Sequence, residues 1–542
     1  MFKKNNKVKV LLEMRPAFEG FAGIPQEVRL LFRGLRKIDS VEVEGMLQTS
    51  RRRLARGTIN KENFFSRRLS SARRFARYSN VIISLIEKPQ RNLLDSLTEY
   101  FSQRAELLAL QLSLLVGFGS IKLSSFKSQS FEDFTWRTLF SKTLPASDFK
   151  LVATANHKIC SISWHTLHMV GLGTLTWRLS SKAKYPKIDT SGFDIFIGQT
   201  PYPGRVTGRT QLIIRYHDAI PIFMPHTISD KSIHQATHFY ALLDNVDQRA
   251  WFACVSEATR QDLIRVFPAA ESRSVTIHNM VSHHYFNEDS SPALVAGIIR
   301  ARLYGNDQDG KYDNDKNLIG LEPNFLTLRE QENFYTKHLS SKPLKYLLIV
   351  STIEPRKNHI RLLAAWEIIK ADIDRDLKLV IVGTLGWDYK QIFSGFKSWI
   401  DRGEIFMLNA VPAPDLRVLY RHAAATVCPS VGEGFDFSGV ESMACGGLTV
   451  ASDIAVHVEI YDDAAEYFDP YSTLSLVTAL KKVLYDETSQ VREVQLREKG
   501  KEVSARYLPE KILPQWKQFL GRVVGVKSLE NFQEQTHSTS NF

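Results

Sequence analysis

The chain has 542 residues, of which 44% are hydrophobic and 24% charged, and its formal net charge is +12. This length exceeds one typical core and indicates at least two domains, with a composition that is ordinary for a globular protein. The positive charge favours acidic partners such as a nucleotide or an anionic lipid surface, and no apolar run is long enough to make a membrane-spanning protein.

The cysteines and the N-terminus indicate a protein of the reducing cytoplasm. Residues 1–7 are basic and lack the apolar core and cleavage site of a signal peptide. The four cysteines are widely spaced and form no CxxC or Cys/His pattern, as expected of small buried residues: Cys160, Cys254, Cys428 and Cys445.

Residues 8–14 predict a first β-strand, and residues 28–35 have the apolar spacing of a helix. The loop between them contains Gly20 and Gly23. Strand, glycine loop and helix in this order are typical of the opening of a Rossmann-like unit.

Residues 48–150 predict an insertion in this first domain. It is rich in arginine, with Phe64, Phe65, Leu69 and Phe75 interleaved, and it contains an apolar segment at 107–118. Two interpretations remain open: docking on an anionic membrane, or a helical insertion with a solvated basic face and its own small core. No recognisable RNA- or DNA-binding module accompanies the charge, so a nucleic-acid partner is not expected. The basic residues between Arg51 and Arg77 are Arg51, Arg52, Arg53, Arg56, Arg67, Arg68, Arg73, Arg74 and Arg77.

Residues 194–200 and 211–216 predict buried parallel strands, and His217 follows the second of them. Ligands of open α/β sheets bind at the carboxyl ends of the strands, so His217 is a candidate site residue. Ser256 follows another predicted strand and is expected to cap a helix at residues 257–267.

A second domain is predicted to begin near residue 343, after an Asp-, Asn- and Gly-rich stretch that we interpret as a linker with an irregular insertion. In this domain Arg356 and Lys357 lie between an apolar strand and an amphipathic helix. Two fixed cations beside a helix N-terminus suit a diphosphate, whereas the simpler interpretation is a solvated basic pair.

Glu433 and Glu441 flank a loop and a helix start that includes Phe437, Ser438 and Gly439. A helix start presents N–H groups to a bound anion, and two carboxylates in one cleft suit the hydroxyls of a polyol. Taken alone, the pair is better explained as one capping acid and one solvated acid.

Three pieces in this order resemble retaining glycosyltransferases of family 4, with the GT-B architecture, over about residues 210–470. They are Arg215-Tyr216-His217-Asp218 with the later Val255-Ser256-Glu257, then Ile353-Glu354-Pro355-Arg356-Lys357-Asn358, then the Glu433–Glu441 element with Met443-Ala444-Cys445-Gly446.

The resemblance implies a role for each candidate residue. His217 meets the donor sugar near the reacting carbon, Glu433 binds sugar hydroxyls and Glu441 binds ribose hydroxyls. Arg356, Lys357 and the N–H groups of residues 437–439 stabilise the departing nucleoside diphosphate, so no metal and no catalytic nucleophile are expected. Main-chain groups near Ala410 and Val411 read the base, and the Gly20–Gly23 loop approaches the phosphates unless its glycines serve only as turn residues. Asp436 and Ser438 depart from the family pattern, which has glycine and proline there.

The expected fold is therefore α/β, with two Rossmann-like, doubly wound parallel-sheet domains facing a cleft and a helical basic insertion in the first. The expected boundaries are 1–286 for the N-terminal domain, 287–342 for the linker, 343–507 for the nucleotide-sugar domain, 508–525 for a helix returning to the first domain, and 526–542 for a disordered tail.

The implied function is transfer of a hexose, by resemblance mannose from GDP-mannose, to a hydroxyl of a glycan or lipid-linked acceptor in bacterial surface polysaccharide synthesis. The implied location is the cytoplasm or the inner face of the plasma membrane. Two other classes remain open: a nucleotide-sugar epimerase or phosphorylase on the same scaffold, and an inactive membrane-docked scaffold protein.

Overall fold

The structure, a computed structural model, describes residues 7–18, 20, 21, 23–58, 71–86, 93–117, 120–176, 181–303, 323, 325–339 and 343–525. The predictions for the tail at 526–542 and for Phe64, Phe65, Arg67, Arg68 and Leu69 lie outside these residues. No helix in the described part of the chain has the length and apolar character needed to cross a bilayer.

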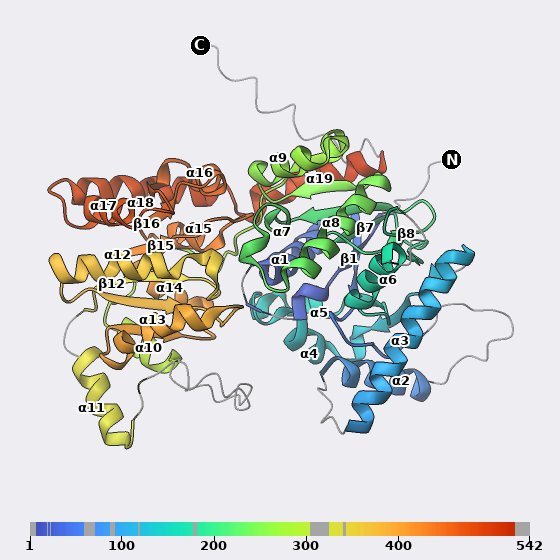
Figure 1. Ribbon diagram of the computed structural model, residues 1–542, viewed down its shortest axis with the longest axis horizontal. Helices are drawn as coiled ribbons and strands as arrows, with labels where there is room; N and C mark the ends of the chain where they lie inside the picture. Colours follow the sequence, from blue (N-terminus) through green and yellow to red (C-terminus); the bar gives the residue numbers. More distant parts are fainter. Residues whose placement is uncertain are drawn as a thin grey trace, which may run out of the picture.

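Two separate parallel sheets form the centres of two domains (Figure 1). The N-terminal sheet has the strand order β11-β10-β9-β7-β1-β2-β5-β4, in which only β4 runs antiparallel to its neighbour. Its strands are β1 (Val8–Glu13), β2 (Val41–Leu47), β4 (Ser124–Lys127), β5 (Asn156–Ile159), β7 (Ile195–Gly198), β9 (Gln211–Tyr216), β10 (Trp251–Cys254) and β11 (Ser274–Thr276). A small parallel sheet joins β3 (Ser120–Ile121), β6 (Lys187–Ile188) and β8 (Arg205–Val206).

The C-terminal sheet is entirely parallel, with the order β14-β13-β12-β15-β16-β17. Numbered within the domain, this is the doubly wound order 3-2-1-4-5-6, whose connections reverse direction between the first and fourth strands. The loops that leave β12 and β15 therefore diverge and open a crevice. The strands are β12 (Tyr346–Val350), β13 (Lys378–Val382), β14 (Ile405–Leu408), β15 (Ala425–Cys428), β16 (Thr449–Ser452) and β17 (Ala465–Phe468).

Helices cover both sheets (Figure 1). Those of the N-terminal domain are α1 (Ile24–Lys37), α2 (Ser71–Ile86), α3 (Leu93–Val116), α4 (Glu132–Thr135), α5 (Phe149–Ala153), α6 (Trp164–Thr176), α7 (Ile220–Phe223), α8 (Lys231–Asp247) and α9 (Glu257–Val266). Those that follow are α10 (Leu294–Arg302), α11 (Leu328–Leu339), α12 (His359–Asp372), α13 (Tyr389–Asp401), α14 (Ala413–His422), α15 (Phe437–Ala444), α16 (Ala455–Tyr461), α17 (Thr473–Leu484), α18 (Ser489–Ala505) and α19 (Pro509–Val524).

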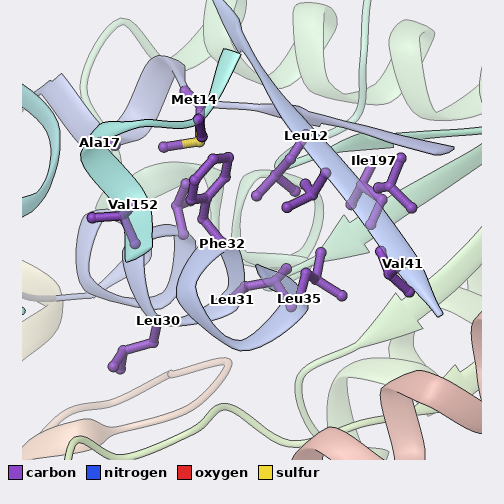
Figure 2. Packing of buried hydrophobic residues seen from close by; sticks show 14 of the residues in the cluster. Leu12, Met14, Ala17, Leu30, Leu31, Phe32, Leu35, Val41, Val152 and Ile197 are labelled. Atoms are coloured by element: carbon purple, nitrogen blue, oxygen red, sulfur yellow. The ribbon is translucent and has the colours of Figure 1, made fainter. Parts of the chain in front are cut away.

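The N-terminal core forms where α1 packs on the central strands. Leu31 and Leu35 recur one turn apart on α1 and are buried with Leu12 of β1 and Ile197 of β7 (Figure 2). Apolar residues at this spacing form one face of a helix, and that face covers the sheet. The predicted α/β class with two parallel, doubly wound sheets is confirmed, and so is the Ser256 cap, whose side chain accepts the Thr259 N–H.

The stretch that we interpreted as a linker contributes to the C-terminal domain. Its helices α10 and α11 bury Val295, Ile299 and Tyr335 in one cluster with Leu348 and Phe406 of the second sheet. Its polar composition concealed the few apolar residues that are needed to dock two short helices. The interpretation as an irregular segment is therefore wrong for α10 and α11.

The last helix of the described residues, α19, crosses back to the N-terminal domain (Figure 1), where Leu513 packs against Gly34 of α1. Ile512, Trp516, Phe519 and Leu520 join the core formed by β1 and α1. The Arg215 guanidinium lies 5.2 Å from the centre of the Trp516 ring, so α19 also contacts the strand that leads to His217.

Replacing the fully buried Trp516 should weaken the N-terminal domain. Because a cavity would form in its core, we expect Trp516→Ala to lower the free energy of unfolding by about 3–5 kcal/mol. Gln518→Ala, an exposed position on the same helix, should change it by less than about 0.5 kcal/mol. Urea denaturation followed by circular dichroism measures both, and equal midpoints would show that α19 is not part of this core.

Candidate functional site

The connectivity of the second sheet brings Arg356 and Lys357 beside Glu433. The two cations follow β12 and the glutamate follows β15, and these strands are neighbours. The Val431 N–H donates to the Arg356 carbonyl oxygen at 3.0 Å, which ties the two loops together. Asn358 fixes the end of the first loop: its backbone is left-handed, with φ of 56°, and its amide donates to the carbonyl oxygens of Pro429 and Pro470.

Glu433 is held between the two cations. Its Oε1 is 2.5 Å from Lys357 Nζ and its Oε2 is 2.7 Å from Arg356 Nη1. Burial alone would raise the pKa of Glu433, but the charges of Arg356 and Lys357 outweigh it and hold the pKa below its usual value. Arg356 also pairs with Glu354 at 2.7 Å, and although burial opposes it, these two carboxylates raise the pKa of Arg356. Glu433 and Arg356 therefore stay ionised and are fixed in position by this pairing.

His217 faces this loop from the other domain. The Cβ that an alanine would add at Gly434 falls 1.6 Å from the His217 carbonyl oxygen, so only glycine allows the two backbones to approach this closely. Burial, together with the charge of Arg215, lowers the pKa of His217 well below its usual value, so the ring is neutral. Its Nε2 is buried without a hydrogen-bond partner.

Glu441 lies on α15 and bridges the domains. Its Oε1 accepts a hydrogen bond from Gln26 Nε2 of α1 at 2.8 Å, and its Oε2 accepts one from the Tyr420 hydroxyl at 3.2 Å. Burial raises the pKa of Glu441 to about 8 even though both donors oppose the shift. The side chain predicted to receive ribose hydroxyls is therefore occupied by Gln26, and a ligand that binds Glu441 must displace or share that amide.

Asp436 caps α15, at the helix start that was predicted to receive phosphate. Its Oδ1 accepts the N–H of Ser438 at 3.0 Å and the hydroxyl of Ser438 at 2.7 Å. Burial favours the neutral acid, but the neighbouring His457 imidazole, the Lys357 charge and Ser438 lower the pKa of Asp436 below its usual value. An anion therefore already lies at this helix terminus, and the Ser438 N–H is engaged within the chain.

Residues of both domains enclose a cleft of about 590 Å³. Such a volume lies in the usual range for a small-molecule site. The predicted site residues that line it are Gly20, Gly23, His217, Arg356, Lys357, Ala410, Val411, Glu433, Phe437, Ser438 and Glu441. Gly439 is the exception: a Cβ there would meet the Tyr461 ring at 2.3 Å, so this glycine makes room for α16 and is not on the cleft wall.

Gly20 and Gly23 both have φ of 70°, a left-handed conformation that favours glycine, so each serves as a turn residue. Both also line the cleft, and the two interpretations of this loop are therefore compatible. Ala410 has φ of 50°, and its N–H donates to Asn409 Oδ1 at 2.8 Å, so the predicted base-reading turn has a constrained backbone.

Several lining residues were not predicted from the sequence. Gln26 and Lys142 come from the N-terminal domain, and Tyr285 and Trp387 come from segments that carry no recognisable motif. Tyr420 lies behind the wall, where its hydroxyl donates to Glu441. The Trp387 indole donates to the Thr227 carbonyl oxygen at 2.8 Å across the domain interface. Single polar or aromatic side chains of this kind leave no periodic signal. Among the residues described, no group of three His, Cys, Asp or Glu side chains is placed to hold a metal ion.

Residues 330–503 match the family model described as Glycosyl transferases group 1. This segment contains the C-terminal sheet together with the loops that carry Arg356, Lys357 and Glu433. A likeness to a sucrose-phosphate synthase from Thermosynechococcus elongatus extends over 96% of this chain and 100% of that chain, with a TM-score of 0.54 and 14% identity. At this identity the likeness concerns the fold alone, and it confirms the GT-B architecture.

Two curated relatives share parts of the sequence. The chain is 31% identical over 143 residues to the O-antigen chain mannosyltransferase B of Escherichia coli. The matched segment covers 26% of this chain and 38% of that protein. It is 24% identical over 277 residues to the O-antigen chain mannosyltransferase RfbU of Salmonella typhimurium. This matched segment covers 51% of this chain and 65% of that protein. The matches span less than two thirds of either relative.

Replacing Gly434 by alanine should separate the two walls at this point. The new methyl group would clash with the His217 carbonyl, so we expect several-fold faster amide exchange around residues 217–223 and 430–436. Hydrogen–deuterium exchange with mass spectrometry measures this. Gly297→Ala is the matched control because a Cβ there has no neighbour within 4 Å, and unchanged exchange in Gly434→Ala would contradict the close approach.

Glu441 should make the protein less stable as the pH rises. The pKa is about 8 in the folded chain against 4.5 for a free side chain, so between these values only the folded state holds the proton. The free energy of unfolding should therefore fall through this window, by at most about 1.4 kcal/mol per pH unit, and Glu441→Gln should remove that fall. Urea denaturation of both proteins from about pH 5 to about pH 9 measures the difference, and parallel curves would show that Glu441 is ionised in the fold.

Proposed function

We propose that the protein is a retaining hexosyltransferase that moves a mannosyl group from a nucleotide-diphosphate sugar to a hydroxyl of a glycan or lipid-linked glycan. The observation that carries the proposal is the fixed pair Arg356–Lys357 with Glu433 between them, at the crossing point of a doubly wound sheet and opposite His217. The match of this domain to Glycosyl transferases group 1 supports glycosyl transfer, and the names of the two relatives support mannose.

The donor diphosphate would lie against Arg356 and Lys357. Cleavage of the bond between C1 of the sugar and the phosphate oxygen leaves negative charge on the diphosphate, and fixed cations stabilise that charge without reorganising. No metal ion is part of this proposal. Because Asp436 already engages the Ser438 N–H, the guanidinium and the ammonium carry more of this stabilisation than the start of α15 does.

Glu433 and Glu441 would accept hydrogen bonds from the sugar and the ribose, respectively. Glu433 is ionised and held by both cations, so it also couples the position of the sugar to the position of the diphosphate. The ribose hydroxyls would replace the Gln26 amide on Glu441, which makes donor binding a contact shared by both domains. The base would lie near Ala410 and Val411, and GDP is the first nucleotide to test.

The acceptor hydroxyl would attack C1 from the face that the diphosphate leaves. A new bond forms between C1 and the acceptor oxygen, the bond to the phosphate oxygen breaks, and the hydroxyl proton passes to that oxygen. The neutral His217 ring lies beside this path and can position the sugar without adding a competing charge. The cytoplasmic location expected from the sequence remains part of the proposal.

Removing one cation should lower the rate of the reaction far more than it lowers the stability of the fold. We expect Lys357→Ala to lower kcat/KM for mannosyl transfer or donor hydrolysis by about 10²–10³-fold, because it removes charge stabilisation of the leaving group. Lys390→Ala, an exposed lysine of the same domain, is the matched control and should retain full activity.

The assay is release of the nucleoside diphosphate from a panel of nucleotide sugars, with and without a chelator, followed by NMR of the product anomer. Equal activity of Lys357→Ala and the control would remove the cleft from the reaction. An inverted anomer would overturn retention, and no release from any donor would favour a scaffold role.

A further inference from the structure

Helices α2 and α3 expose large apolar side chains to solvent. Single exposed residues of this kind are normal, but on α3 Leu108, Leu112 and Val116 recur four residues apart and form one stripe with Tyr100. The large apolar side chains that these two helices expose, from 43% to 67%, are Phe75, Ile83, Ile86, Tyr100, Phe101, Leu108, Leu112 and Val116.

The opposite faces of both helices are packed against the domain. Tyr78 and Val81 of α2 are buried in the N-terminal core. Gln111 of α3 is buried against Gly173 of α6, where an added Cβ would lie 1.9 Å from its amide nitrogen. Because each helix is already docked by one face, the exposed stripe is a second, outward surface.

Exposed arginines lie on both helices and on the neighbouring segment 51–56. Residues 51–56 contact both helices. Arg52 donates to the Leu85 carbonyl oxygen at the end of α2, and Arg53 lies 3.5 Å from Glu106 of α3. Arg104 belongs to the α3 stripe itself, one turn after Tyr100. The exposed arginines of this region are Arg51, Arg53, Arg56, Arg73, Arg74, Arg77 and Arg104. We call these arginines and the eight exposed apolar residues the arginine-flanked face.

We propose that the arginine-flanked face docks the protein on the surface of an anionic lipid bilayer. Apolar side chains between cationic ones are the pattern of a helix that lies in the plane of the interface, with the apolar groups at the acyl boundary and the charges among the headgroups. The number of arginines favours a lipid surface over a second copy of this chain, whose face would carry the same charge.

Docking there would leave the rest of the enzyme free to move. Both helices lie at the outer edge of the N-terminal domain, on the side away from the C-terminal domain (Figure 1). The N-terminal domain would therefore be held at the membrane while the C-terminal domain exchanges its nucleotide. The inference does not depend on the proposed reaction, because it concerns surfaces outside the cleft.

The test is co-sedimentation of the full-length protein with vesicles of phosphatidylcholine alone and with vesicles that also contain phosphatidylglycerol. We expect binding to the anionic vesicles only, weakened by salt. Arg74→Gln/Arg77→Gln/Arg104→Gln should reduce partitioning at least about tenfold, since each basic residue near an anionic surface contributes to attraction. Phe101→Ser/Leu108→Ser/Leu112→Ser should also abolish stable binding.

Matched controls change the same residue types elsewhere on the surface. Arg209→Gln/Arg329→Gln/Arg375→Gln removes the same charge, and Leu474→Ser/Val491→Ser/Val494→Ser removes exposed apolar side chains from the C-terminal domain. Both controls should bind anionic vesicles like the unchanged protein.

Three results would overturn the proposal. The first is equal binding to both vesicle types, and the second is an equal loss of binding in the control variants. The third is a protein that binds no vesicles and that light scattering shows to be a dimer, where the apolar variant is a monomer. The last result would assign the face to self-association. Circular dichroism of each variant checks that the exposed substitutions leave the fold intact.

Discussion

The site depends on one interaction, the buried carboxylate of Glu433 between the side chains of Arg356 and Lys357. A charge this far from water is tolerated only when it is paired, and here each partner restrains the others. The arrangement exists because β12 and β15 are neighbours although more than seventy residues separate them in the chain. The order of strands in the sheet therefore determines the electrostatics of the cleft, where Arg356 and Lys357 are held in place by carboxylates before any ligand enters.

The two domains meet at contacts that leave little freedom. Gly434 abuts the backbone of His217, and Gln26 reaches Glu441, so both elements of the Glu433–Glu441 segment contact the other domain. Glu459 of α16 adds a third contact by accepting the N–H groups of Glu257 and Ala258 at the start of α9. At Gln26–Glu441 and at Glu459 with the start of α9, polar groups of one domain are therefore paired with polar groups of the other. Under the proposed function, the ribose hydroxyls would replace one of these internal partners, the Gln26 amide on Glu441.

Much of this could be predicted from the sequence because the relevant signals are local. Apolar runs followed by polar loops identified strands at the centre of both sheets, such as β1, β9 and β12, but β2, β4, β5 and β17 were not predicted. Short motifs at strand ends identified part of the cleft wall. The side chains contributed by single positions were not predictable. Gln26 and Trp387 act across the domain interface, and nothing in their local sequence shows what they will face. The position of Gly439 off the cleft wall was not predictable either, because a glycine near a helix start suggests phosphate binding and nothing local shows that a Cβ there would meet the Tyr461 ring. The helices α10 and α11 were missed because a polar composition outweighs a few docking residues.

The return of α19 to the first domain has a consequence for how the chain is made. Trp516 and its neighbours complete a hydrophobic core whose other members come from the first fifty residues and from the middle of the chain. A ribosome synthesises the N-terminal sheet first, yet this core stays incomplete until the final helix emerges. The second domain also depends on late residues, because one of its clusters extends to Leu496 and another to Val503 and Tyr507. The apolar residues of the first domain therefore stay partly uncovered during most of translation, and the nascent first domain is the stage at which a chaperone would be needed.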